Sequence, residues 1–181
     1  MTIEACADLV RRADPDRFLA TMAAPAAARA PLFAIYALNV EVARAPWVTQ
    51  ETLIAEMRLQ WWRDALAGIA GGGEAGAHEV LTPLAEVLTP GLAAALDPLV
   101  EARRWDIYRD PFADETALEA HIDRTAGTLL RVAARSLGPA DETVVGDLAH
   151  AAGLANWLRA VPGLAARGRV PLPDPTPDGI R

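Results

Sequence analysis

The sequence predicts an all-α protein, and three observations carry that prediction. Apolar residues recur at helical spacing along nearly the whole chain, no segment shows the sustained alternation typical of half-buried strands, and the segments between periodic stretches are short. With 52% apolar and 23% charged residues, the composition is that of a globular protein and excludes general disorder. A length of 181 residues suits one domain with a core of several helices.

Helix-breaking residues divide the periodic pattern into its elements in chain order. Thr49 and Asp114 stand where their side chains can accept backbone N–H bonds as N-caps, and Gly71 to Gly73, Gly138-Pro139 and Pro162-Gly163 stand where helices are expected to end. The predicted helices are Ile3–Ala13, Asp16–Met22, Pro25–Ala45, Thr49–Ala70, His78–Leu88, Leu92–Arg109, Asp114–Leu137 and Asp141–Val161. The segment that follows, "PLPDPTPDGIR", reads as an extended loop or linker because prolines interrupt any helix.

The charge and cysteine content exclude several classes of protein. A net charge of −7 argues against a nucleic-acid-binding protein, which needs a concentrated basic surface. The single cysteine, Cys6, supports neither an internal disulfide nor a thiolate zinc site, which fits a reducing compartment. All 17 basic residues are Arg and Ala is abundant, a bias expected of a GC-rich, bacterial genome. No apolar run reaches the roughly 20 residues of a spanning helix, and the first residues lack the apolar core of a signal peptide, so we expect a cytoplasmic protein, at most peripheral to the inner membrane.

Four segments resemble the squalene and phytoene synthases, and together they cover nearly the whole chain. They are "DPDRFLATMAAPAAARAPLFAIYALN", "LVEARRWDIYRDPF", "DETALEAHIDRTAGTLLRVAARSLG" and "GLANWLRAVPGLAARGRVPLP". The resemblance implies an isoprenoid-synthase-like helical bundle over residues 1–173 that lacks the family's C-terminal helices. Residues 174–181 are then a proline-rich tail at a truncation point, and the shortened chain should expose apolar surface.

In that family, two facing helices each present a pair of carboxylates one turn apart, which hold Mg²⁺ against a prenyl diphosphate. Such spacing places both side chains on one helix face, and Mg²⁺ prefers oxygen ligands alongside phosphates. The matching positions here are Ala43 and Trp47, then Ala160 and Leu164, all of them apolar. The sequence therefore predicts a diphosphate cleft without metal ligands, with no catalytic residue and no cofactor; Mg²⁺ is expected only if the protein is an enzyme after all.

Three polar residues match family positions of the diphosphate site: Tyr36, Asn156 and Arg159. The arginine expected one turn after the tyrosine is replaced by Val40. The three residues have two interpretations: groups that hydrogen-bond between buried helices, or a residual anion-binding site. Either way, the segments around Tyr36 and Asn156 are expected to face each other across a central cleft.

A narrower resemblance rests on "YALNVEVARAPWVTQETLIAEMRLQWWRDAL" and "WLRAVP". These segments are similar to the noncatalytic branch of the family that contains a mitochondrial complex I assembly factor with a phytoene-synthase-like domain. Trp61 and Arg58 are candidate partner-binding residues, because aromatic and arginine side chains dominate interface hot spots. Trp62 follows the helical spacing of Leu59 and Leu66 and is therefore expected in the core.

Other chemically suggestive residues favour structural roles. Glu115, Glu119 and Asp123 form an acidic stripe that fits the solvated side of an amphipathic helix better than a metal site. The three histidines, His78, His121 and His150, have no local ligand spacing and are expected to be structural or exposed.

These observations support three functional hypotheses. The first is a noncatalytic assembly or binding factor in the biogenesis of respiratory complex I, with a complex I subunit or assembly intermediate as partner. The second is a prenyl diphosphate transferase of the squalene/phytoene synthase type, which the four apolar positions disfavour. The third is a protein that binds an isoprenoid or lipid without chemistry.

Overall fold

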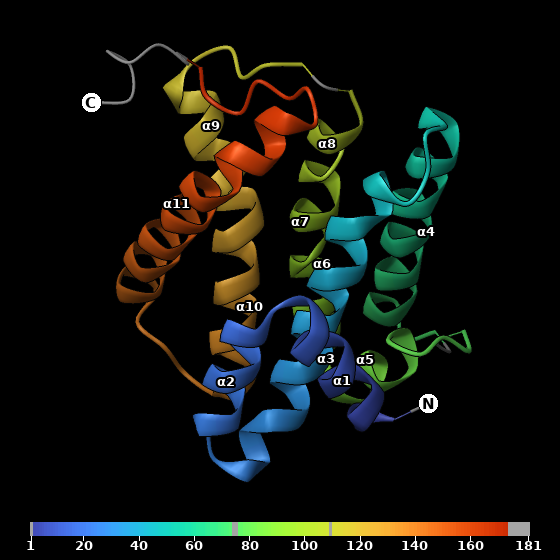
Figure 1. Cartoon of the computed structure of the whole chain (residues 1–181). Coiled ribbons are helices and arrows are strands. Elements are labelled where there is room, and N and C mark those ends of the chain that lie inside the picture. Colours follow the sequence, from blue (N-terminus) through green and yellow to red (C-terminus); the bar gives the residue numbers. More distant parts are fainter. Residues whose placement is uncertain (1, 74–75, 109, 174–181) are drawn as a thin grey trace.

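The computed structural model describes residues 2–73, 76–108 and 110–173 and shows an all-α bundle (Figure 1). No strand occurs within these ranges, so the predicted fold class is confirmed. The elements are α1 (Ile3–Ala13), α2 (Pro15–Ala23), α3 (Ala26–Arg44), the 3₁₀ turn η1 (Ala45–Trp47), α4 (Thr52–Ala70), α5 (Leu81–Val87), α6 (Pro90–Ala95), α7 (Asp97–Ala102), α8 (Trp105–Tyr108), α9 (Glu115–Ile122), the π-turn η2 (Asp123–Gly127), α10 (Thr128–Leu137) and α11 (Glu142–Ala166). The predicted tail 174–181 lies outside the described residues.

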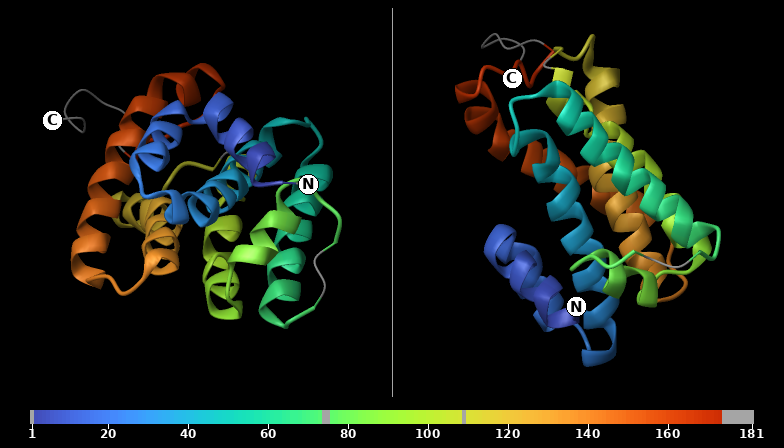
Figure 2. Two further views of the ribbon diagram at one scale, coloured as in Figure 1. Left: turned by 90° about the horizontal axis from the view of Figure 1, so that it is seen from below. Right: turned by 90° about the vertical axis from the view of Figure 1, so that its right-hand side faces the viewer.

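The main core is built around α3, which packs against α1, α2, α5 and α10 (Figures 1 and 2). Phe33, Ile35, Leu38 and Val42 on α3 are all buried. Full burial of an aliphatic or aromatic side chain of this size contributes about 1.5–3 kcal/mol. Trp62 on α4 joins this core, as its helical spacing predicted.

The only cysteine lies in the contact between α1 and the rest of this core. Cys6 is fully buried together with Val10, which follows it by one turn. Burial, assisted by the charge of Glu79, raises the pKa of the Cys6 thiol to about 11. The thiol is therefore a small apolar core group rather than a nucleophile.

The predicted helix Leu92–Arg109 is wrong, since the chain forms three short helices there: α6, α7 and α8. Pro98 lacks the N–H that would bond to the carbonyl of Ala94, so the α-helical ladder breaks between α6 and α7. The amides of Arg103 and Arg104 then bond to carbonyls three residues back, which tightens the turn before α8.

The predicted helix Asp114–Leu137 is interrupted by the π-turn η2, although Asp114 caps its start as expected, accepting from the amide of Ala117. At η2 the Thr125 hydroxyl donates to the carbonyl of His121 at 2.7 Å. This turn receives α11 at close range: a Cβ on Gly153 would lie 2.7 Å from side-chain atoms of both Ile122 and Ala126. Glycine at position 153 therefore permits the contact between α11 and η2.

Three predicted helix ends are also wrong. Helix α4 starts at Thr52, because the Thr49 hydroxyl accepts from the amide of Glu51 and forms a turn before the helix. Helix α5 starts at Leu81, because His78 Nδ1 accepts from the amides of Val80 and Leu81 at its entrance. Helix α11 continues through Pro162 to Ala166. Pro162 removes one hydrogen bond, but it lies on the exposed side of α11, where water can solvate the carbonyl left without a partner.

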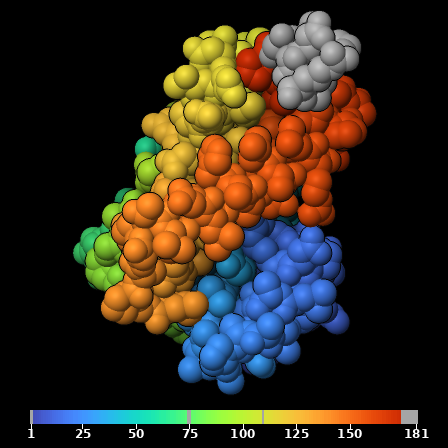
Figure 3. Space-filling view, turned by 90° about the vertical axis from the view of Figure 1, so that its left-hand side faces the viewer, coloured from blue at the N-terminus to red at the C-terminus, as the bar shows by residue number. Residues whose placement is uncertain are grey.

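The outward face of α11 is unusually apolar. Val144, Leu148, Ala151, Ala155 and Leu158 follow helical spacing along one side, and all five are exposed. Figure 3 shows that α11 presents a long face at the surface of the molecule. The face buried against η2 consists of small residues such as Ala149 and Gly153. The exposed apolar surface that the sequence predicted is therefore present on α11. None of the described helices combines the length and hydropathy that a transmembrane span requires.

Candidate functional site

Tyr36 lies on α3, partly buried, and contacts α2. The guanidinium of Arg17 lies over its ring, 5.6 Å from the centroid, within cation–π range. Arg17 also pairs with Asp14, the N-cap of α2. Burial raises the pKa of the Tyr36 hydroxyl, and the charge of Arg17 partly opposes that shift. Tyr36 is thus a neutral hydroxyl held beside a cation.

Asn156 and Arg159 are exposed on α11. Arg159 Nη1 lies 3.4 Å from Asp16 Oδ2 on α2, an ion pair that water surrounds. The interpretation of Asn156 and Arg159 as groups buried between helices is therefore wrong. In Figure 3 a recess separates much of α11 from the N-terminal helices, with part of α3 visible inside it. The structure brings Tyr36 and Arg159 to two neighbouring residues of α2, Arg17 and Asp16.

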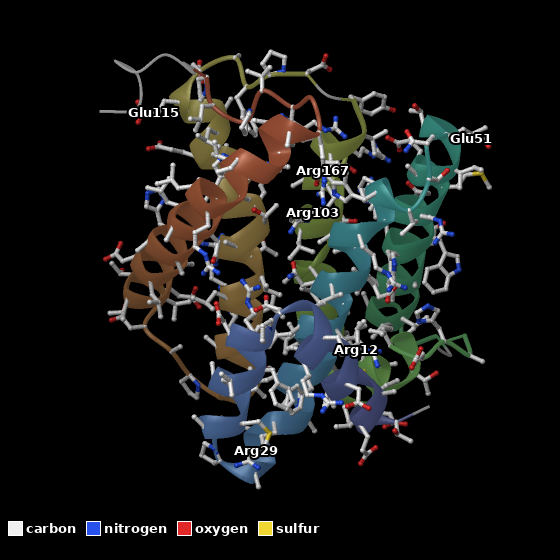
Figure 4. The ribbon with its side chains drawn as sticks, viewed as in Figure 1. Arg12, Arg29, Glu51, Arg103, Glu115 and Arg167 are labelled. Carbon is white, nitrogen blue, oxygen red and sulfur yellow. The ribbon has the colours of Figure 1, made fainter. Side chains whose placement is uncertain are left out.

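The positions assigned to metal ligands by the family resemblance hold no carboxylate: they are Ala43 on α3, Trp47 in η1, and Ala160 and Leu164 on α11. The Trp47 ring is covered by the guanidinium groups of Arg167 and Arg169, at 5.0 and 4.8 Å from its centroid. Arg167 is labelled beside the end of α11 in Figure 4. Two positive charges at this position repel a divalent cation.

A cationic cluster lies in the interior next to Trp47. Arg103 Nη1 lies 3.7 Å from Asp106 Oδ2, and Arg103 Nη2 donates to Asn39 Oδ1 at 3.5 Å. Arg169 donates to the backbone carbonyl of Asp106. Desolvation lowers the pKa of Arg103 and raises the pKa of Asp106, and their opposite charges act against both shifts. Two positively charged guanidinium groups lie beside the single carboxylate of Asp106, so the cluster favours anions over metal cations.

A second, aromatic cluster ties α11 to α8 and α9. His121 is enclosed by Trp105, Phe112 and Trp157, with ring centroids 5.1–5.7 Å from its own. The Trp157 indole donates to the carbonyl of Pro171 at 2.9 Å and holds the segment after α11. Desolvation, with the nearby charges of Arg103 and Arg124, lowers the pKa of His121 to about 3. His121 is therefore a neutral core group.

The described residues contain no group of three or more His, Cys, Asp or Glu side chains arranged to hold a metal ion. The acidic stripe predicted on α9 and η2 remains on the surface, with Glu115, Glu119 and Asp123 all exposed. Asp123 pairs with Arg131 at 2.8 Å. The interpretation of the stripe as the solvated side of a helix agrees with this placement.

A pocket of about 420 Å³ opens between α3 with η1 on one side and α4 with His78 on the other. Arg44, Val48, Met57, Arg58, Trp61 and His78 contribute to its lining. Two parts of the first segment that carried the narrower family resemblance, Glu41 and the stretch Met57–Trp62, therefore meet at one site. The second segment, "WLRAVP", contributes no residue to the lining. Trp61 and Arg58, predicted as partner-binding residues, both line this pocket and are both exposed.

The helical bundle, with its recess between α3 and α11, defines a synthase-type domain whose metal positions are apolar. The family described as squalene/phytoene synthase matches residues 10–175, and the chain belongs to that family.

The chain is 26% identical over 172 residues to "NADH dehydrogenase (ubiquinone) complex I, assembly factor 6" of Bos taurus and, equally, to that of Homo sapiens. It is 29% identical over 175 residues to the homolog of that factor in Drosophila melanogaster. These alignments cover 92–93% of this chain but 52% of each relative, so the chain spans about half the length of the relatives it matches. No solved structure matches the chain.

Sequence reasoning missed three contributors to these sites. Arg17 lies beside Tyr36, and Arg44 and His78 line the pocket. Arg17 lies far in sequence from Tyr36, and His78 lies far in sequence from Trp61, so no local spacing indicates these contacts. Arg44 lies within the segment that carried the narrower resemblance, three residues after Glu41, and that spacing could have identified it.

Proposed function

We propose that this chain is a noncatalytic binding domain that acts in the assembly of respiratory NADH:quinone oxidoreductase, complex I. The observation that carries the noncatalytic part is Trp47, which occupies a metal-ligand position of the family beneath Arg167 and Arg169. A diphosphate leaving group needs Mg²⁺ for charge neutralisation. The four metal-ligand positions supply no carboxylate to hold Mg²⁺, and the positive charges of Arg167 and Arg169 repel it. The protein then works without a metal cofactor.

The pathway part of the proposal is supported by the relatives, which are named as complex I assembly factors. The pocket, lined largely by the first segment of the narrower resemblance, is consistent with a binding role, because it exposes Trp61 and Arg58 for a partner. A partner of this kind, a complex I subunit or assembly intermediate, would bring the protein to the inner membrane as a peripheral component.

The absence of catalysis is tested directly by turnover. Purified protein is incubated with Mg²⁺ and farnesyl or geranylgeranyl diphosphate, beside an active synthase of the family as positive control. We expect no product above a protein-free blank. Product that depends on added Mg²⁺ would refute the noncatalytic proposal.

The role in assembly is tested by deleting the full-length gene in its host. Membrane NADH:quinone oxidoreductase activity should fall, while squalene and carotenoid contents stay unchanged. A fall in isoprenoid products with normal respiratory activity would instead favour the transferase. If neither changes, the assembly role is wrong, and co-purified lipid would then favour a lipid-binding protein.

A further inference from the structure

The pocket between α3 and α4 is surrounded by exposed apolar side chains. Val48 is 52% exposed, Met57 63% and Trp61 44%. These residues lie together at the pocket lining, whereas exposed apolar side chains scattered singly would need no explanation. Methionine, tryptophan and arginine are the residue types enriched at protein interfaces. The composition of this surface is therefore that of a docking site.

The aromatic wall of the pocket is held in place before any ligand arrives. The Trp61 ring contacts Trp62 edge to face at a centroid distance of 4.9 Å, and His78 lies 5.0 Å from Trp61 and 5.1 Å from Trp62. Trp62 is buried in the main core and so fixes this group. Because Trp61 is already ordered, a partner loses little side-chain entropy by binding it.

The charge at the pocket is positive, although the chain as a whole carries −7. Glu41 pairs with Arg44 at 3.0 Å. Among the described residues, Arg58 has no hydrogen bond or ion pair, and its side chain is exposed. One guanidinium therefore remains uncompensated beside an apolar surface.

We propose that this pocket docks an acidic amphipathic helix of a partner protein. The helix would pack an apolar side chain against Trp61. One of its carboxylates would accept hydrogen bonds from the Arg58 guanidinium, and two parallel hydrogen bonds would strengthen that pair. A pocket of about 420 Å³ holds one or two large side chains, while the exposed residues at its rim require an occupant that extends beyond it. A helix meets both requirements. This inference rests on the proposed function, because it names the chemistry of the partner.

The probe is a phage-displayed library of 16-residue peptides patterned as amphipathic helices, with random residues flanking the apolar face. It is selected against the purified protein, and binders that persist on Trp61→Ala protein are removed. We expect the remaining peptides to carry Asp or Glu beside the apolar stripe. Recovery of basic or uncharged peptides, or of no Trp61-dependent peptide, would overturn the proposal.

Two variants then test the charge. For a selected peptide, Arg58→Glu should weaken binding at least tenfold in fluorescence anisotropy and should favour the same peptide with Lys in place of Glu. Arg12→Glu is the matched control, because Arg12, labelled in Figure 4, is exposed on α1, does not line the pocket and has no ion pair among the described residues. Equal effects of the two variants would overturn the proposal, provided that thermal unfolding shows both to be folded.

A vesicle-binding experiment distinguishes a protein partner from a membrane surface. Sedimentation with phosphatidylcholine vesicles containing 30% phosphatidylglycerol should not depend on Trp61 or Arg58. Vesicle binding that both residues control would overturn the peptide proposal.

In the host, Arg58→Glu in the full-length protein should lower complex I activity. If gene deletion lowers this activity and Arg58→Glu does not, the proposed function stands and the docking inference fails.

Discussion

Among single residues, His121 has the clearest effect on how stability depends on pH. Its imidazole is 6% exposed, and desolvation keeps it neutral well below the pH at which an unfolded histidine gains a proton. The cluster around it joins α8, α9 and α11 to the segment that includes Pro171. Protonation of His121 would therefore place an unpaired charge where three elements meet.

We predict that the free energy of unfolding falls as the pH is lowered from about 6.5 towards 3. The pKa of His121 is about 3 in the folded protein and about 6.5 in the unfolded chain, so between these values the unfolded state binds the additional proton. Stability is fully present above pH 6.5 and is lost below it, with a slope approaching about 1.4 kcal/mol per pH unit. Urea unfolding from pH 7 to pH 4 measures this slope.

The control separates His121 from the carboxylates that also titrate in acid. His121→Phe should remove this component of the slope, whereas His150→Gln, at an exposed position, should leave it unchanged. Identical slopes for wild type and His121→Phe would show that His121 is not the responsible group.

At the same scale, helical spacing placed Trp62 in the core and left Trp61 outside it, as observed. It could not place Arg17 on Tyr36, or Arg167 and Arg169 on Trp47, because these contacts join residues that are distant in the chain. Apolar periodicity reports which side of a helix is buried. It does not report what covers the polar side.

Among the elements, α11 depends most on close backbone approach. Its buried residues include the small Ala149 and Gly153, and Gly153 brings it against η2. Gly153→Ala should destabilise the protein by about 1–3 kcal/mol, because the new methyl group overlaps Ile122 and Ala126. Thermal unfolding measures the change.

Gly163→Ala in the same helix is the matched control. Nothing lies within 4 Å of a Cβ at Gly163, so alanine there should stabilise the protein by up to about 1 kcal/mol through helix propensity. If both substitutions have the same sign, the close contact at Gly153 is not what limits the packing of α11.

Two of the helices that the sequence misplaced, α6 with α7 and α11, were misread at a proline. Apolar periodicity continues through the chain from Leu92 to Tyr108, but Pro98 breaks the hydrogen-bond ladder within it. In α11 the opposite happened, because Pro162 was expected to end a helix that continues to Ala166. A proline removes one hydrogen bond in both cases, and tertiary packing decides whether the helix resumes in the same direction.

For the whole molecule, the outward apolar face of α11 governs behaviour in solution. Val144, Leu148 and Leu158 are 50–63% exposed along one line. We predict that the purified chain binds a hydrophobic dye and self-associates with rising concentration. Leu148→Gln with Leu158→Gln should weaken both effects without lowering the unfolding temperature.

Leu19→Gln serves as the comparison, since Leu19 on α2 is 66% exposed but lies outside the α11 face. Sedimentation velocity and dye fluorescence measure the outcome. A chain that stays monomeric and dye-free at high concentration would contradict this prediction.

The family and the all-α architecture could be predicted from the sequence, because motif order and helical spacing are local properties. The pocket could not be predicted in this way. It forms only where α3, α4 and the segment of His78 come together, which brings Arg44, Trp61 and His78 to one site. Motif order and helical spacing indicated the class of protein, and three-dimensional contacts were needed to locate the docking surface.

The buried thiol of Cys6 can report how often α1 leaves the core. The sequence contains one cysteine, and its pKa of about 11 leaves about one thiol in a thousand ionised at pH 8. The core against which α1 packs shields this thiol from reagents. Alkylation by a maleimide should therefore proceed only when α1 detaches from the core. The labelling rate then reports how often that happens, at a single position and without any introduced probe. Labelling as fast as that of a free thiol would mean that α1 does not stay docked in solution.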